Sequence, residues 1–423
     1  MKKQIISAIK SDFFKKFSIY GFGQFFNLVT PLLLIPYIVK VCGEENFGKV
    51  SVALAISFVL IVFIDYGSEL VGVRDITINR NDKKELQRIF LTNLVSRFLV
   101  LILVLVVSLV LIFCLPFLQS ETILFALSLL IILGQYLNQS WFLQGVDNIN
   151  WISISNIISK IIYVIGVLVL VVKKEDYIYV NFSFGLGTII SNGIFTYLIF
   201  KKYDFKFEKI SKREIKDFLK RDFKMFSSQI FVAIQLYSPV VLVSFFGNNF
   251  MAGQYRIVEQ IIVTFKTYIF LFFNFTYPRV CNDINNNPST AKRNWLIINT
   301  VNVLFIVFLM LILYFNSEII VTFFNATTVF DLSNLLKIAV FIPILLAISI
   351  SLKQLVLGYN FQKQYVLITT VSVIISLILI VLFLPIYKLQ GVFYSLIITE
   401  VIVIIFYLFC IRKRPNHFLA KDV

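Results

Sequence analysis

The sequence predicts an all-α, polytopic membrane protein with about twelve transmembrane helices, arranged as two pseudo-symmetric six-helix bundles around a central cavity. Hydrophobic residues make up 59% of the 423 residues, whereas soluble domains contain about 45–50%, and the mean hydropathy is +0.87. The apolar runs are about twenty residues long, which is the length that a helix needs to cross the hydrocarbon core. They do not alternate with polar residues as the strands of a membrane β-barrel would.

Apolar windows place the transmembrane helices one after another with short connections between most of them. The chain begins with a basic amphipathic segment that lacks a signal-peptide cleavage site, so we expect a cytosolic lead-in to the first helix. The long polar connection 201–222 lies at the middle of the chain and is rich in Lys and Arg. The windows lie at 17–39, 50–64, 91–115, 122–143, 151–172, 178–200, 223–246, 254–277, 295–315, 334–357, 364–384 and 391–411.

The positions of Lys and Arg predict the orientation, because cytoplasmic loops are enriched in both. With the N-terminus inside, the cytoplasmic segments hold 28 of these residues and the opposite loops hold five. Both termini are therefore expected in the cytoplasm.

The basic segment divides the chain into an N-terminal bundle at 1–200, a cytoplasmic linker at 201–222 and a C-terminal bundle with a short cytoplasmic tail at 223–423. Each half opens with basic residues, a Pro-containing span and a short turn with Gly, Asn and Phe, Gly43–Gly48 in one and Gly247–Phe250 in the other. An even number of helices in each half gives the two repeats the same orientation. Chance similarity between membrane turns is the alternative.

Six basic side chains lie inside the predicted spans, where a charge at the helix centre costs roughly 2.5–3.5 kcal/mol. Four lie close enough to a span end to extend their charge to the interface. Lys160 and Lys266 cannot do so easily, since each lies roughly 15–18 Å from the nearer end of its helix at 1.5 Å per residue. The six bases are Arg97, Lys160, Arg256, Lys266, Lys337 and Lys353, and the acids inside spans are Glu259 and Glu400.

Two interpretations of these charges remain open. In the structural one, Arg256 neutralises Glu259 three residues away, and Lys266 pairs with Glu259 or Glu400. In the functional one, the charges make a net cationic cavity for a phosphate-bearing substrate, because ammonium and guanidinium groups donate charge-assisted hydrogen bonds to phosphate. Lys160 is the first candidate, since its span contains no acid and Ser153, Asn156 and Tyr163 share its helix face by their spacing.

Amide side chains on the inner helix faces extend this candidate site, although amides also commonly join membrane helices. The complete set of predicted substrate contacts is Lys160, Lys266, Arg256, Arg97, Asn27, Gln24, Asn156 and Gln235. Neither the four scattered cysteines nor the single histidine suggests a metal site. No cofactor is expected, and there is no nucleotide-binding motif.

Four motifs occur in a specific order along nearly the whole chain. The first is Asn27-x3-Pro31-x4-Pro36 followed by Gly43-x3-Phe47-Gly48, and the second is Asp65-Tyr-Gly67 with Arg74. The third is Trp141-Phe-Leu-Gln-Gly145 with Lys160 beyond it, and the fourth is Gly247 with Ala252-Gly253-Gln-Tyr255 and Tyr277-Pro278. With these motifs the sequence resembles the polysaccharide-repeat (O-antigen) flippases of the multidrug/oligosaccharidyl-lipid/polysaccharide exporter superfamily.

This resemblance implies a bacterial inner-membrane flippase for oligosaccharide units carried on undecaprenyl pyrophosphate. The substrate would move from the cytoplasmic to the periplasmic face through a cationic cavity that opens alternately to each side. Membrane lipids and, as further partners, a polysaccharide polymerase with its chain-length machinery are implied. The resemblance favours a monomer, and nothing suggests a nucleic-acid partner. Coupling to a proton or sodium gradient through Glu259 or Glu400 is a hypothesis.

Three other functions compete with this interpretation. A multidrug exporter of the same superfamily would carry an acid in its first helix, and 17–39 contains none. Peptidoglycan-precursor flippases typically have two more C-terminal helices. A membrane glycosyltransferase or polymerase would need loop carboxylates, whereas the longest outward loop, about 316–333, contains only Glu318 and Asp331. The sugar composition of the repeat unit cannot be read from the chain.

Overall fold

The computed structural model describes the backbone at residues 2–286 and 288–412, and the side chains at 26–284, 286 and 290–412. Helices account for nearly all of these residues, and no strand occurs among them. Ten of the helices are long and apolar enough to cross a membrane. Contacts divide the chain into two compact units, Met1–Tyr237 and Ser238–Val423.

Two of these ten helical segments each contain two predicted spans. The helix α1 (Lys2–Asp65) is broken at Gly43, which has φ of 81°, and α15 (Gln362–Arg412) is broken at Lys388, which has φ of 50°. Both breaks fall between predicted spans, so the ten helices contain all twelve predicted windows. Glycine adopts the positive φ at the first break without steric cost.

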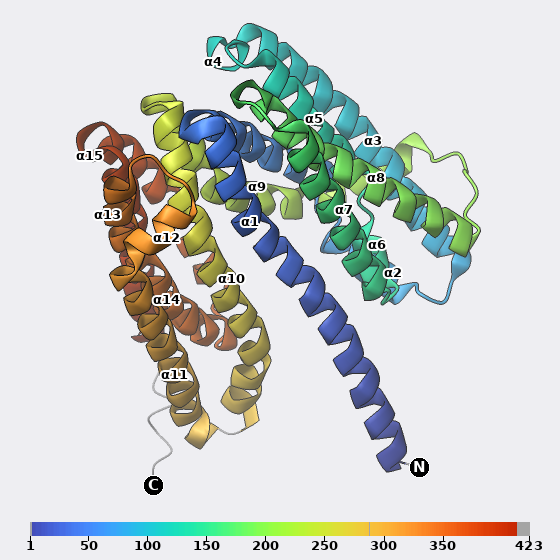
Figure 1. Ribbon diagram of the computed structural model, residues 1–423. Helices are drawn as coiled ribbons and strands as arrows, with labels where there is room; N and C mark the ends of the chain where they lie inside the picture. The colour runs from blue at the N-terminus through green and yellow to red at the C-terminus, as the bar shows by residue number, and fades with distance from the viewer. Residues whose placement is uncertain (1, 287, 413–423) are drawn as a thin grey trace. The chain divides into compact units, whose positions relative to one another are not determined.

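The first unit contains α1 together with seven further α-helices, a short 3-10 helix and most of α9. In addition to α1, these elements are α2 (Val71–Ile78), α3 (Lys83–Cys114), α4 (Pro116–Gln119), α5 (Thr122–Tyr136), α6 (Ser140–Gly145), α7 (Ile149–Leu170), η1 (Lys174–Tyr177), α8 (Ile178–Tyr203) and α9 (Lys212–Phe246). Within this unit α8 packs on α5 and α7, and α1 packs on α3, α5 and α7 (Figure 1). The backbones of α5 and α8 approach closely, since a Cβ on Gly185 would lie 2.7 Å from Cβ of Leu130.

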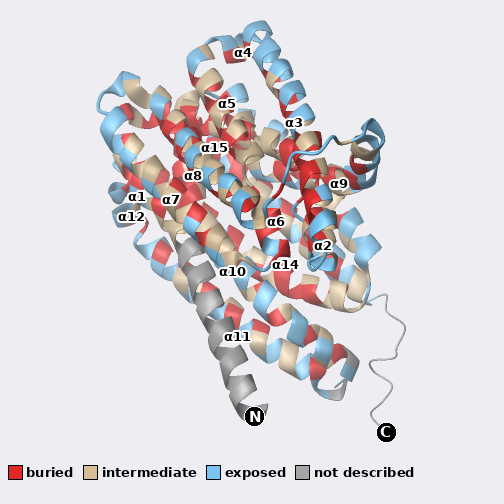
Figure 2. Ribbon diagram, turned by 90° about the vertical axis from the view of Figure 1, so that its right-hand side faces the viewer, coloured by how far each residue is buried: buried red, intermediate tan, exposed pale blue. Residues whose placement is uncertain are grey.

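The second unit contains the C-terminal end of α9 and six further helices. These are α10 (Asn249–Asn286), α11 (Pro288–Phe315), α12 (Ser317–Phe323), α13 (Val329–Ala339), α14 (Phe341–Gly358) and α15. Here α14 packs against α10, α11 and α15. In both units the buried residues lie where helices face each other, and many exposed positions carry large apolar side chains (Figure 2). Lipid solvates such positions in a membrane protein.

The segment 201–222, predicted as a cytoplasmic linker, contacts the first unit. Its irregular stretch contacts α3 through Gln87, whose amide donates to the backbone oxygen of Lys206 and to Glu208 at 3.0 and 2.7 Å. From Lys212 onward the segment is already part of α9. The boundary between the two compact units falls inside α9, after Tyr237.

Arg97 is the centre of the largest buried polar network that the first unit shows. Its side chain is 0% exposed, so the prediction that it could reach the interface is wrong. Its guanidinium donates to the backbone oxygens of Ile64, Gln135 and Asn138 at 2.9, 2.9 and 3.3 Å. These oxygens lie at or just beyond the C-terminal ends of α1 and α5, where carbonyls lack partners within the helix and a cation is favourable.

Two side chains complete the Arg97 network. The guanidinium donates to Gln139 Oε1 at 3.4 Å and to Asp65 Oδ1 at 3.3 Å. Asp65 also accepts from the amide of Gln135 at 2.9 and 3.0 Å. All five N–H groups of Arg97 are thereby engaged inside the bundle.

We expect Arg97→Met to destabilise the protein by about 3–5 kcal/mol, because it leaves the carboxylate of Asp65 buried without its charge partner. Chemical unfolding of the purified protein in lipid or mild detergent measures this change. The double variant Arg97→Met with Asp65→Asn should recover part of the loss, since no buried charge remains. Equal stability of Arg97→Met and the wild type would contradict this role.

Candidate functional site

Lys160 lies on α7 within the first unit, and its ammonium group faces an aromatic ring. The Nζ atom lies 4.7 Å from the centroid of the Phe184 ring on α8, close enough for a cation–π interaction. The side chain is partly exposed. Among the described residues no carboxylate forms an ion pair with it. The described part of the bundle therefore provides Lys160 with an aromatic ring and no negatively charged partner.

A row of aromatic rings continues from Phe184. Tyr163 of α7 meets Phe184 edge-on with ring centroids 5.2 Å apart, and Phe58 of α1 meets it at 6.1 Å. The ring of Phe58 in turn lies 5.1 Å from that of Tyr237 on α9. All four rings are partly exposed. The sequence placed Tyr163 on the face of Lys160, but it did not bring Phe58, Phe184 or Tyr237 to that face.

The predicted amide contacts have different surroundings. Asn156 lines a cavity of about 10 Å³ between α5–α6, α7 and α8, which admits about one water molecule and no sugar. Asn27 and Gln235 are partly exposed on α1 and α9. The side chain of Gln24 lies outside the described residues. Asn156 therefore fits the role of an interhelical contact better than that of a substrate ligand.

Of the predicted substrate contacts, Arg97 has the surroundings that argue most strongly against substrate binding. It is fully buried and its five N–H groups already donate within the bundle. No donor remains for a phosphate. We therefore leave Arg97 out of the site proposed below.

In the second unit, Arg256 and Glu259 of α10 form an ion pair at 2.6 Å. Glu259 also accepts from the hydroxyl of Tyr255 at 3.3 Å, and Tyr255 is buried with its ring stacked on Phe393. This pairing agrees with the structural interpretation of Arg256 and Glu259. The carboxylate of Glu259 is therefore already bound by side chains of its own helix, α10.

Lys266 and Glu400 are arranged differently. Glu400 of α15 accepts a hydrogen bond from the hydroxyl of Ser349 on α14. Lys266 and Glu400 form no direct ion pair. Lys266 is partly exposed, like Lys160. The two acids inside the predicted spans of the second unit thus differ. Glu259 forms an ion pair, whereas Glu400 accepts from a neutral hydroxyl.

Lys353 is a candidate that the sequence analysis assigned only to the interface. Its Nζ atom lies 5.0 Å from the ring centroid of Phe273 and 4.7 Å from that of Tyr365. The arrangement resembles that of Lys160 on Phe184, with two rings in place of one. No signal in the sequence could have revealed it, because Phe273 comes from α10, far away along the chain, and helix periodicity does not specify how α15, which carries Tyr365, packs on α14.

Comparison with known proteins gives a consistent result. Residues 13–282 match the family model described as polysaccharide biosynthesis protein. The chain is 22% identical over 395 residues to a protein named "Putative O-antigen transporter" from Escherichia coli (strain K12), covering 92% of this chain and 94% of that protein.

Solved structures show the same fold. An inward-facing multidrug resistance MATE family transporter of the MOP superfamily superposes with a TM-score of 0.74 at 14% identity, over 93% of this chain and 96% of that one. The lipid II flippase MurJ, in an inward closed conformation, superposes with a TM-score of 0.72 at 18% identity, over 95% and 89%. The fold predicted from the sequence is confirmed, and since the family model covers more than half of the residues, the chain belongs to the polysaccharide biosynthesis protein family.

Proposed function

We propose that this protein is a flippase that moves undecaprenyl-pyrophosphate-linked oligosaccharide units from the cytoplasmic to the periplasmic face of the bacterial inner membrane. Membership of the polysaccharide biosynthesis protein family and the name of the Escherichia coli relative support this proposal. The structural observation that carries it is the ammonium group of Lys160, partly exposed and without a carboxylate partner among the described residues. A charge retained at membrane depth marks a substrate pathway by default.

The chemistry of such a substrate matches the described residues. A diphosphate carries negative charge that lysine ammonium groups bind through charge-assisted hydrogen bonds. Each unit has its own candidates for this role, Lys160 in the first unit and Lys266 and Lys353 in the second. The aromatic row that begins at Phe184 offers flat apolar faces to the sugar rings. The prenyl chain stays in the lipid. Transport of this kind makes and breaks no covalent bond, so the proposal is a carrier and not an enzyme.

Orientation and energy source form part of the same proposal. The excess of Lys and Arg on one side favours both termini in the cytoplasm. For ion coupling we place Glu400 before Glu259, because Glu259 is tied to Arg256 at 2.6 Å, whereas Glu400 has a neutral hydroxyl donor. A monomer that hands its substrate to a polymerase fits this role.

A multidrug exporter is the alternative within the same fold, and an inward-facing structure of one superposes well. The residues within the described spans argue against it. A cationic drug would meet the charge of Lys160, which nothing in its bundle neutralises. Residues 17–39 also contain no acid to couple cation flow in the first helix.

Deletion of the gene in the native host, followed by complementation, tests the substrate. We expect lipid-linked units to accumulate on the cytoplasmic face, and wild type to restore surface polysaccharide. Lys160→Ala and Lys266→Ala should each lower export about ten-fold or more, because each removes a charged hydrogen bond worth about 1.5–3 kcal/mol. Lys201→Ala, an exposed lysine at the end of α8, is the matched control. Unchanged polysaccharide after deletion would refute the substrate, and full export by the lysine variants would refute the site.

Cysteine labelling tests whether Lys160 faces water. In a background without the native cysteines, we expect Lys160→Cys to react with a water-soluble thiol reagent. Ile165→Cys is the matched control on the same helix, since Ile165 is 56% exposed but should face lipid, where a reactive thiolate does not form. Equal labelling of both positions, or labelling of position 165 alone, would contradict a wet site at Lys160.

A further inference from the structure

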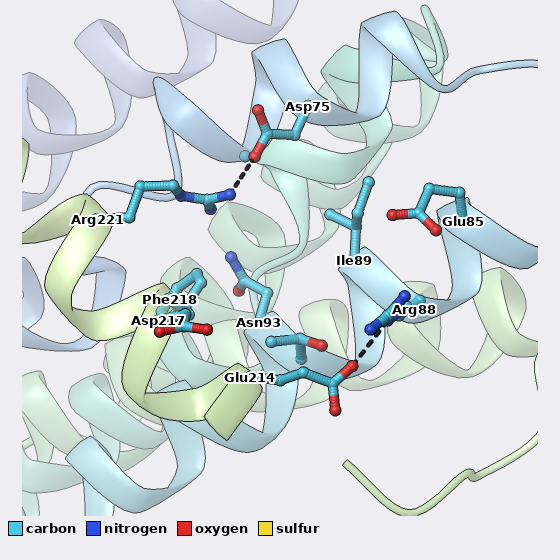
Figure 3. Close-up of a pocket in the computed structure, with 11 residues that line it drawn as sticks. Asp75, Glu85, Arg88, Ile89, Asn93, Glu214, Asp217, Phe218 and Arg221 are labelled. Atoms are coloured by element: carbon cyan, nitrogen blue, oxygen red, sulfur yellow. Dashed lines mark hydrogen bonds and ion pairs between the residues drawn. The ribbon is translucent and has the colours of Figure 1, made fainter. Parts of the chain in front are cut away.

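A pocket with no part in the proposed transport route lies between α2, α3 and α9 of the first unit (Figure 3). Its volume is about 210 Å³, equivalent to several water molecules at about 30 Å³ each. It lies where α3 and α9 begin, next to the segments that the Lys and Arg counts place at the cytoplasmic surface. A small polar ligand or the headgroup of a lipid fits this space.

The charged groups that line the pocket are mostly acids. Four carboxylates, those of Asp75, Glu85, Glu214 and Asp217, accompany the guanidinium groups of Arg88 and Arg221. Both arginines are already committed to acids. Arg88 Nε lies 2.7 Å from Glu214, and Arg221 Nη1 lies 2.9 Å from Asp75.

Two carboxylates of the pocket have no strong partner among the described residues. Glu85 forms no ion pair there, and Asp217 has only Arg213 at 3.9 Å, in a pair whose two side chains are 92% and 70% exposed. An ion pair this exposed to water contributes little to stability. The unneutralised charge of the pocket is therefore negative, which excludes an anionic ligand.

Asn93 provides an independent indication of a ligand. Its side chain is 1% exposed and lines the pocket from α3, and Figure 3 shows its amide between the Arg221–Asp75 pair and Glu214. The amide nitrogen donates to Ser68 Oγ at 2.8 Å, but the oxygen Oδ1 accepts no hydrogen bond from the residues that the structure describes. A buried acceptor without a donor costs free energy. A ligand with an N–H group would supply the missing hydrogen bond to Oδ1.

The donor set also distinguishes between cations. Among the residues that the structure describes, no group of three acidic, histidine or cysteine side chains could hold a metal ion. A primary ammonium group, in contrast, carries positive charge and three N–H donors. It can donate a hydrogen bond to one amide oxygen and others to carboxylates that do not converge on a single point.

We propose that this pocket binds a primary ammonium group, with Asn93 Oδ1 as a hydrogen-bond acceptor and Glu85 and Asp217 as the source of attraction. The ammonium comes either from an ethanolamine lipid headgroup or from a free amine. Because Arg88–Glu214 and Arg221–Asp75 also hold α9 against α3 and α2, a bound ammonium stabilises the docking of α9 within the first unit.

Thermal unfolding of the whole protein in nanodiscs of phosphatidylcholine and phosphatidylglycerol tests the proposal. We expect methylammonium chloride to raise the melting temperature, and tetramethylammonium chloride, which has the same charge but no N–H donor, to leave it unchanged. The variant Glu85→Gln with Asp217→Asn should need at least ten-fold more methylammonium for the same shift. Asp331→Asn, an exposed acid on α13, is the matched control and should respond like the wild type.

Nanodiscs that contain phosphatidylethanolamine distinguish the two sources. If the lipid headgroup fills the pocket, the wild type should melt higher in these nanodiscs and methylammonium should add nothing, with both effects lost in the double variant. If a free amine is the ligand, the methylammonium shift should persist there. Equal shifts from both ammonium salts, or an undiminished shift in the double variant, would overturn the proposal.

Discussion

The first bundle depends on one requirement, that polar groups at membrane depth find their partners inside the protein. Arg97 meets this requirement for three backbone oxygens at once, at the C-terminal ends of α1 and α5. Lipid offers no water to such oxygens, and the last carbonyls of a helix lack their regular partners within the helix. The helices α1 and α5 can therefore end at Asp65 and before α6, because the guanidinium of Arg97 from α3 donates to the carbonyls at both ends.

The same requirement distinguishes a structural charge from a functional one. Arg97 has five donors and five acceptors, with Asp65 to balance its charge. Lys160 has an aromatic face in place of a carboxylate. An aromatic ring attracts a cation without neutralising it, so Lys160 remains available to a negative ligand. Both residues are basic groups inside predicted spans, and only their surroundings differ.

Electrostatic contacts outside the hydrocarbon region determine where the middle of the chain lies. Asp204 of the segment after α8 pairs with Lys83 at 3.1 Å, and this lysine holds the pKa of the carboxyl below its ordinary value. Further along, Glu214 and Arg221 bind groups of α3 and α2. The exposed pairs are individually weak, but together they fix α9 on the first unit. The acidic pocket of Figure 3 is a consequence of this docking.

The sequence by itself determined the all-helical membrane fold and which segments form the long apolar helices, because apolar length is a local property of the chain. It also predicted which ionisable residues lie inside the apolar spans. It could not determine their partners, because Arg97 meets Ile64 and Gln135, and Lys160 meets Phe184, only after separate helices pack together. Only the tertiary structure decided that Arg97 is satisfied within the bundle and that Lys160 has no ion-pair partner among the described residues, since both depend on the geometry of groups that helix periodicity does not specify.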